Sequence, residues 1–172
     1  GTTISISGNS ITNNGVSGTN YAPLSVYLLA PGITTYITNN TIITNNTITG
    51  NYGYDSGGIL QAYLQGTGSN MVISQNEITD NFGRGIDISN SYVTDSAVTI
   101  TDNLIKGNSK EGISAQATNG GNITISSNQI ISNQSGGIKA RGESTGNKSY
   151  INVTNNIIHG NSVSAVPGAA AI

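Results

Sequence analysis

The chain has 172 residues, which predicts a single domain over residues 1–172, and its formal net charge is −2. Only 8% of its residues are charged and no basic patch occurs, so we expect neither a nucleic-acid partner nor a strongly charged surface. It has no cysteine, which excludes disulfides and thiol catalysis. The apolar stretch "APLSVYLLAPG" is too short for a membrane span and is closed by prolines.

One spacing of isoleucine and asparagine recurs along the chain. In residues 121–133, "GNITISSNQIISN", isoleucines alternate with polar residues as in a strand until Asn128 interrupts them. Six copies of this pattern occur in chain order, in residues 6–14, 43–51, 73–81, 100–108, 125–133 and 153–161. Successive copies begin 37, 30, 27, 25 and 28 residues apart, which is typical of a structural repeat with variable loops. The pattern therefore predicts six coils.

Each copy predicts two short strands and a third strand after its second asparagine. The third strand is expected to start at Ile86, Ile113, Ile138 and Val166, usually preceded by glycine, with Ile59 in this role after a three-residue insertion. Residues 15–36 and 52–57 are expected to be loops. Between residues 33 and 51 two registers fit, one starting at Ile37 and one at Ile43. We prefer Ile43 because "TITGN" at 47–51 matches "LIKGN" at 104–108.

Strands of three to five residues cannot bury an apolar face alone, but stacked coils share one continuous core. Parallel stacking at about 4.8 Å per coil places isoleucine above isoleucine. An asparagine at a bend is expected to take the left-handed backbone conformation and to donate its amide to the asparagine of the next coil. The predicted ladder is Asn9, Asn46, Asn76, Asn103, Asn128 and Asn156.

These columns resemble the parallel β-helix repeats of the pectate-lyase-like superfamily, over nearly the whole chain. The resemblance implies an all-β, right-handed parallel β-helix of about six coils with an asparagine ladder. The superfamily contains polysaccharide lyases, hydrolases and epimerases together with noncatalytic surface proteins. Since a fold of this kind hosts many activities, the site must be argued separately. We expect a noncatalytic surface member.

Three charged residues are the candidate catalytic groups, Asp87, Lys139 and Arg141, since lyases on this scaffold need carboxylates for Ca²⁺ and a basic residue. The outward positions of the third strand are expected to be Leu60 and Ala62, Asp87 and Ser89, Ser114 and Gln116, then Lys139 and Arg141. Asp87 and Lys139 would lie two coils apart, about 10 Å. We interpret these charges as solvated surface groups, so the chain is not expected to be an enzyme or to hold a metal or cofactor.

Other polar residues carry weaker signals. Arg84 and Glu111 occupy equivalent positions in adjacent coils and are expected to form an ion pair. His159 is expected to face outward with no histidine or carboxylate neighbour, which disfavours metal binding. Six sequons are candidate glycosylation sites, but so many arise by chance in an asparagine-rich chain. They are Asn39, Asn45, Asn122, Asn133, Asn147 and Asn152.

Two binding functions are alternatives. The first strand is expected to direct Thr99 and Thr101 outward, then Thr124 and Ser126, then Asn152 and Thr154, with Ser5 and Ser7 in the first coil. This array resembles that of ice-binding solenoids, although Ile42 and Val72 interrupt it. A polysaccharide could instead bind or be cleaved along the uncharged surface, aided by Tyr52, Tyr54, Tyr63 and Tyr92.

The favoured hypothesis is an extracellular structural β-solenoid of a cell surface, sheath or filament. The chain ends are in phase, since joining residues 166–172 to residues 1–6 gives a connection as long as those inside the repeat. No amphipathic helix or charged cap covers either end in the sequence. Two explanations fit these ends: the chain is one segment of a longer tandem array, or it is a subunit that stacks on other copies. We expect a homopolymer in which residues 153–172 of one subunit stack on residues 2–11 of the next.

Overall fold

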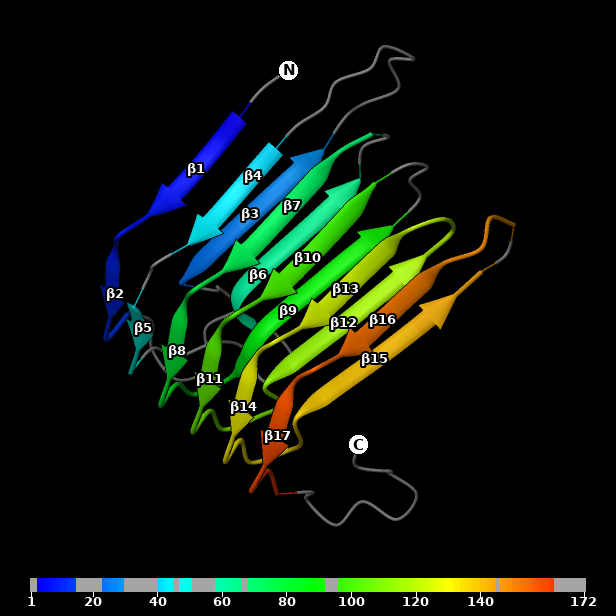
Figure 1. The fold of residues 1–172 in the computed structure, drawn as a ribbon. Coiled ribbons are helices and arrows are strands. Elements are labelled where there is room, and N and C mark those ends of the chain that lie inside the picture. Colours follow the sequence, from blue (N-terminus) through cyan, green and yellow to red (C-terminus); the bar gives the residue numbers. More distant parts are fainter. Residues whose placement is uncertain are drawn as a thin grey trace.

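The structure is a computed structural model that describes residues 3–14, 23–29, 40–44, 47–50, 58–65, 68–91, 96–144 and 146–162. These residues form a parallel β-solenoid with three sheets along its length (Figure 1). No helix in the described part of the chain is long and apolar enough to span a membrane.

The first sheet contains the strands that open each repeat. They are β1 (Thr3–Ser7), β4 (Asn40–Thr44), β7 (Asn70–Ser74), β10 (Ala97–Thr101), β13 (Asn122–Ser126) and β16 (Tyr150–Thr154). The second sheet contains three-residue strands, namely β2 (Ser10–Thr12), β5 (Thr47–Thr49), β8 (Glu77–Thr79), β11 (Leu104–Lys106), β14 (Gln129–Ile131) and β17 (Ile157–His159). The third sheet contains β3 (Leu24–Leu29), β6 (Gly58–Gln65), β9 (Arg84–Ser91), β12 (Ile113–Thr118) and β15 (Ile138–Glu143).

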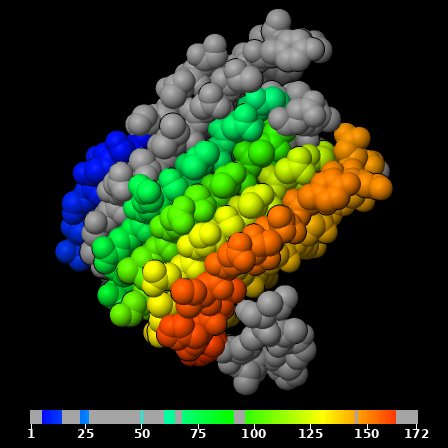
Figure 2. Space-filling model, viewed as in Figure 1, coloured from blue at the N-terminus to red at the C-terminus, as the bar shows by residue number. Residues whose placement is uncertain are grey.

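Neighbouring strands in all three sheets pair in parallel, each with the equivalent strand of the next repeat. Three consecutive turns each place one strand in every sheet: β7–β8–β9, β10–β11–β12 and β13–β14–β15. The space-filling view shows these turns as parallel stripes of successive colour (Figure 2). The predicted parallel solenoid is therefore present, and its rise follows the sequence order of the repeats.

The core contains two columns of identical residues, while other columns mix apolar residues, as where Met71, Val98 and Ile123 are in register. Ile73, Ile100 and Ile125 are in register in the first sheet and are fully buried. Ile78, Ile105 and Ile130 form the equivalent column of the second sheet. Full burial of an isoleucine side chain stabilises the fold by about 1.5–3 kcal/mol. The inward positions predicted for these isoleucines are correct.

Two ladders of asparagines lie at two bends of each coil, one between the first and second sheets and one between the second and third sheets. In the first ladder the side-chain amides of Asn76, Asn103 and Asn128 each donate to the Oδ1 atom of the next asparagine, at 2.9 Å, and Asn156 ends the series. The second ladder repeats this geometry five residues further along each coil and was not part of the predicted set. It contains Asn81, Asn108, Asn133 and Asn161. Asn46 lies outside the described residues.

The left-handed residue at each bend is not the asparagine itself, which corrects the prediction. It is the residue before it, as at Gln75 (φ 55°), Asp102 (φ 56°) and Ser127 (φ 57°). Turning the chain at that position lets the following asparagine direct its side chain inward, where the amide satisfies main-chain carbonyls. Asn103 Nδ2, for example, lies 2.9 Å from the Ile73 carbonyl of the preceding coil. The asparagine is therefore required for its amide and not for its backbone conformation.

The register of β6 differs from the prediction by one residue. Leu60, and not Ile59, pairs with Ile86, so the insertion after Asn51 is four residues long. Leu60 and Ala62, predicted to face outward, are buried in the core. Because side chains alternate along a strand, a one-residue slip exchanges its two faces. Gln61 and Tyr63 take the outward positions instead.

The predicted loop at 15–36 contains a strand. β3 pairs in parallel with β6, and its Val26 belongs to the core. The short apolar run between two prolines had no asparagine marker to place it in the repeat. The preferred register of the second copy is correct, since Ile43 pairs with both Ile6 and Ile73. The predicted loop at 52–57 and the third-strand start at Val166 lie outside the described residues.

A column of glycines before the third strand has a steric cause. A Cβ atom at Gly85 would lie 2.6 Å from Ile105 Cγ2, and one at Gly112 would lie 2.6 Å from Ile130 Cγ2. The second and third sheets therefore approach too closely at this corner for any side chain.

Replacing Ile105 or Ile130 by Asp should unfold the neighbouring coils, because it places an unpaired carboxylate in the dry core. We expect a loss of more than about 4 kcal/mol of unfolding free energy, whereas the partly exposed Thr101→Ala should cost less than about 1 kcal/mol. Thermal unfolding of the three variants measures the difference. The reverse order of melting temperatures would contradict the inward and outward assignments.

Candidate binding groove on the third sheet

The outer face of the third sheet contains a shallow hollow of about 270 Å³. It is lined by residues from β6, β9, β12 and β15, and we call it the third-sheet groove. Its lining residues are Tyr63, Arg84, Asp87, Ile88, Ser89, Ser114, Ala115, Gln116, Lys139 and Arg141. The groove therefore runs across four coils along the axis of the solenoid.

The strand register explains why these side chains meet. Asp87, Ser114 and Lys139 form one outward column, two coils from end to end as predicted. The next outward column along the strands includes Tyr63 in β6 and Arg141 in β15. All three predicted candidates, Asp87, Lys139 and Arg141, thus line one groove. Tyr63 joins them only because of the corrected register of β6.

Arg84 connects two carboxylates at the start of the groove. Its Nε atom lies 3.0 Å from Glu111 Oε2, which confirms the predicted ion pair, and its Nη1 atom lies 3.6 Å from Asp87 Oδ2. Only 17% of the Arg84 side chain is exposed. Lys139 Nζ lies 3.8 Å from Glu111 Oε1, while 60% of its side chain remains exposed. These four charged residues form one network across three coils.

The pKa values of the two carboxylates in this network, Asp87 and Glu111, shift in opposite directions. Burial raises the pKa of Asp87 above its ordinary value of 3.8, because it outweighs the opposing effects of the Arg84 charge and the Ser114 hydrogen bond. Burial alone would also raise the pKa of Glu111. Hydrogen bonds from its own backbone and from Arg84, with the charges of Arg84 and Lys139, reverse this and lower the pKa below 4.5. Glu111 is thus the better matched partner of Arg84.

The groove presents three cations and one carboxylate among its lining residues, with an aromatic ring at one end. Arg141 is exposed and pairs with Glu143 on its own strand. Such a surface can hydrogen-bond to an extended polar chain and can attract acidic groups. Within the described residues, no group of three or more His, Asp or Glu side chains is placed to hold a metal ion.

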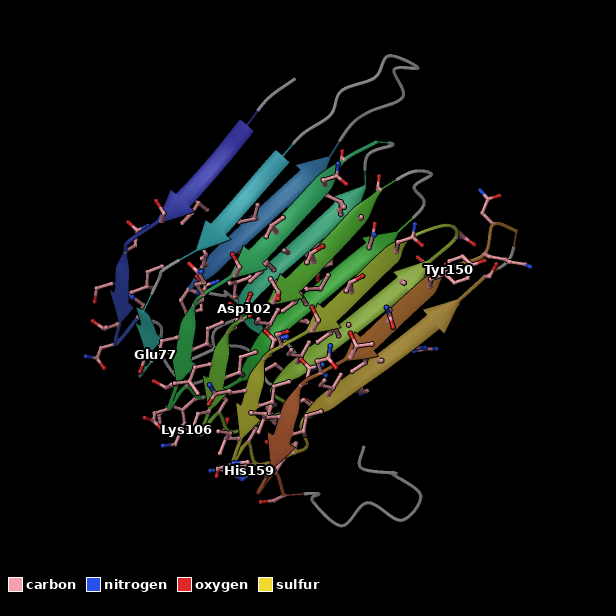
Figure 3. All side chains as sticks on the ribbon, viewed as in Figure 1. Glu77, Asp102, Lys106, Tyr150 and His159 are labelled. Atoms are coloured by element: carbon pink, nitrogen blue, oxygen red, sulfur yellow. The ribbon has the colours of Figure 1, made fainter. Side chains whose placement is uncertain are left out.

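The remaining predicted positions lie apart from the groove. Lys106 and His159 both lie on the second sheet, and His159 is exposed (Figure 3). Tyr52, Tyr54 and Tyr92 lie outside the described residues. The column of serine and threonine on the first sheet is in register from Ser7 to Thr154, with Val72 beside it as expected.

The sequons occupy unlike environments. Asn133 is fully buried and its amide belongs to the second ladder, so a glycan on it is incompatible with the fold. Asn122 is half-buried in β13, whereas Asn147 and Asn152 are exposed. Asn39 and Asn45 lie outside the described residues.

The charge network predicts opposite pH dependences for two isosteric variants. Ionised Glu111 stabilises the fold above pH 4.5, and this contribution is lost as the pH falls through its lowered pKa. Glu111→Gln should therefore be less stable than the native chain at pH 7, with a difference that shrinks toward pH 3.

Asp87 should behave in the opposite way. The native chain loses stability as the pH rises from 3.8 through the raised pKa of Asp87, so Asp87→Asn should be at least as stable as the native chain at pH 7. Thermal unfolding from pH 3 to pH 7 measures both variants. Equal pH profiles for Glu111→Gln and Asp87→Asn would contradict this account of the network.

Comparison with known proteins agrees with the architecture. Residues 1–130, about three quarters of the chain, match the family described as the right-handed beta helix region. No curated protein and no solved structure gave a significant match. Because the match covers more than half of the chain, and the described residues form a parallel β-solenoid, the chain belongs to the right-handed β-helix family.

Proposed function

We propose that this chain is a noncatalytic structural β-solenoid of about six coils, placed outside the cell in a cell surface, sheath or filament. In this proposal the repeat supplies a stiff rod and its ends join head to tail to other copies. The stacked core columns and the two ladders support the stiffness, because from β7 onward the described coils are joined to one another by main-chain and side-chain hydrogen bonds. A parallel solenoid can be lengthened without any new type of contact.

The observation that carries the proposal is the state of the last described coil. β16, β17 and β15 are the end strands of their sheets. Val153 continues the column of Ile125, yet 40% of it is exposed, whereas Ile125 is fully buried. Ile158 likewise continues the column of Ile130 but is only partly buried. The core thus ends in a face whose apolar side chains are only partly covered by the described residues.

The charge network supports a noncatalytic role. Arg84 is held between Asp87 and Glu111, and Lys139 lies beside Glu111. Each of these groups has an opposite charge as its neighbour within ion-pair distance, and the contacts of Glu111 with Arg84 and Lys139 join residues of successive coils. The geometry therefore suits ion pairs that hold adjacent coils together better than it suits proton abstraction from a substrate.

Self-association through the last coil gives the first test. The native chain should form larger species as its concentration rises, measured by sedimentation velocity. Val153→Asp should abolish this association, because a carboxylate would be buried in the joint. Asn152→Asp is the matched control, since it adds the same charge on the exposed outward face of β16.

Two results would contradict the proposal. One is a chain that stays monomeric at high concentration. The other is cleavage of an acidic polysaccharide that is lost in Asp87→Ala or Lys139→Ala, which would make the groove an active site.

A second candidate function is binding of an acidic polysaccharide in the third-sheet groove. It is favoured by the excess of cations in the lining and by Tyr63, whose ring offers a stacking face for a sugar. The groove crosses four coils, so it suits an extended chain better than a small molecule. This binding is compatible with a structural role, because it would attach the rod to a matrix.

Exposed cations should dominate such binding. Lys139→Ala and Arg141→Ala should each weaken binding to polygalacturonate or alginate several-fold, and the effect should diminish at high salt. Binding can be measured by isothermal titration calorimetry with the soluble polysaccharide. Lys106→Ala is the matched control, because it removes one exposed lysine from the second sheet. Equal losses in all three variants would indicate nonspecific attraction and contradict a groove.

A further inference from the structure

Both asparagine ladders stop in the last described coil with one donor left over in each. Inside the ladders the main-chain N–H of every asparagine donates to the Oδ1 atom of the next one, as from Asn103 to Asn128 at 3.0 Å. The second ladder has the same bond from Asn108 to Asn133, at 3.1 Å. In the last coil, the main-chain N–H groups of Asn156 and Asn161 have no acceptor among the described residues.

We propose that a second copy of this chain supplies the two acceptors, through the side chains of its Asn9 and Asn14. This inference rests on the head-to-tail association proposed above and specifies the chemistry of the joint. Asn156 N–H donates to Asn9 Oδ1 of the next copy, and Asn161 N–H donates to Asn14 Oδ1. The two ladders then run through the joint without a break.

The first coil has the geometry that this joint requires. Asn9 and Asn14 are five residues apart, as are Asn156 and Asn161. The Asn9 amide donates to the Ser7 carbonyl at 3.1 Å. Within the ladder, Asn103 makes the same bond to Thr101 and Asn128 makes it to Ser126, both at 3.0 Å. Asn9 therefore already has the orientation of a ladder member.

The hydrogen bonds from each asparagine side chain to a main-chain carbonyl of the preceding coil also have acceptors at the joint. Asn128 Nδ2 donates to the Ile100 carbonyl of the coil before it, at 2.9 Å, and Asn133 Nδ2 donates to the Ile105 carbonyl. At the joint the equivalent acceptors are the carbonyls of Val153 and Ile158. The interface would thus repeat the ladder bonds found between adjacent coils in the part of the chain from Asn76 to Asn161.

The first coil of a second copy matches the last described coil strand by strand. It offers a five-residue and a three-residue strand, equal in length to β16 and β17. Such a contact does not close, so it generates a linear polymer.

Engineered cysteines test the register of the joint, since the native chain has none. In-register stacking places Thr154 about 4.8 Å from Ser7 of the next copy, within disulfide range, so Ser7→Cys with Thr154→Cys should yield disulfide-linked oligomers under mild oxidation. Ser5→Cys with Thr154→Cys is the control, because a two-residue shift moves the pair to about 8 Å, outside that range. Thr154→Cys alone detects tail-to-tail dimers.

The ladder itself is tested by removing the two acceptors. Asn9→Ala with Asn14→Ala should weaken association at least about tenfold, since each lost acceptor leaves a donor unpaired in the joint. Asn147→Ala with Asn152→Ala is the control, because it removes two exposed amides outside the ladders. Thermal unfolding at a concentration where both variants are monomeric separates loss of folding from loss of association.

The possible results distinguish the two proposals. In-register cross-links together with an asparagine-dependent association support the inference. Association that is unchanged by Asn9→Ala with Asn14→Ala overturns the ladder joint but leaves head-to-tail assembly standing. Cross-links from Thr154→Cys alone overturn it in favour of tail-to-tail contact. A chain that remains monomeric, or whose own residues 163–172 prove to cover β16 and β17, overturns both proposals.

Discussion

The structure depends on the requirement that the polar groups at each buried bend be paired. A bend that leaves carbonyls inside an apolar core would cost more than the short strands gain, because an unsatisfied buried group costs about 1–3 kcal/mol. The asparagine side chain solves this twice per coil. Its Nδ2 atom donates to a main-chain carbonyl of the preceding coil and to the Oδ1 atom of the next asparagine, and its own Oδ1 atom accepts from the preceding asparagine. The pairing also fixes the register, because an amide displaced by one residue would face outward. The isoleucine columns follow from that register.

The same constraint separates the parts of the molecule that can vary from those that cannot. From β7 to β14, the inward positions of the first two sheets hold apolar residues, with isoleucine stacked on isoleucine in two columns. The corner before the third strand admits only glycine where an isoleucine side chain of the next coil approaches it. Outward positions have no such restriction. The third sheet uses this freedom to gather Arg84, Asp87, Glu111 and Lys139 into one network over a shallow groove. Function can therefore be placed on this surface at little cost to the fold.

The pKa values of Asp87 and Glu111 shift in opposite directions, although both carboxylates belong to the same charge network. Both carboxylates contact Arg84, yet Glu111 has the shorter contact together with hydrogen bonds that offset its burial. For Asp87, the Arg84 charge and the Ser114 hydrogen bond do not offset the effect of burial, so its pKa is raised. A buried carboxylate with a raised pKa can mark an active site when it lies in a groove. Here the carboxylate of Asp87 lies at the edge of an ion-pair network that joins coils.

The sequence alone determined the parallel solenoid, its repeat length, the isoleucine core and the first asparagine ladder, because equivalent residues of successive repeats must stack when short strands pair in register. It also predicted the pairing of Arg84 with Glu111. Where the repeat carries no asparagine marker, the sequence failed: Leu60 could not be distinguished from Ile59, and β3 was taken for a loop. Only the tertiary structure decided these cases, since neighbouring coils set which face of a strand is buried. It also brought Tyr63 into the groove with Asp87 and Lys139, because that meeting depends on cross-strand register and not on any local pattern.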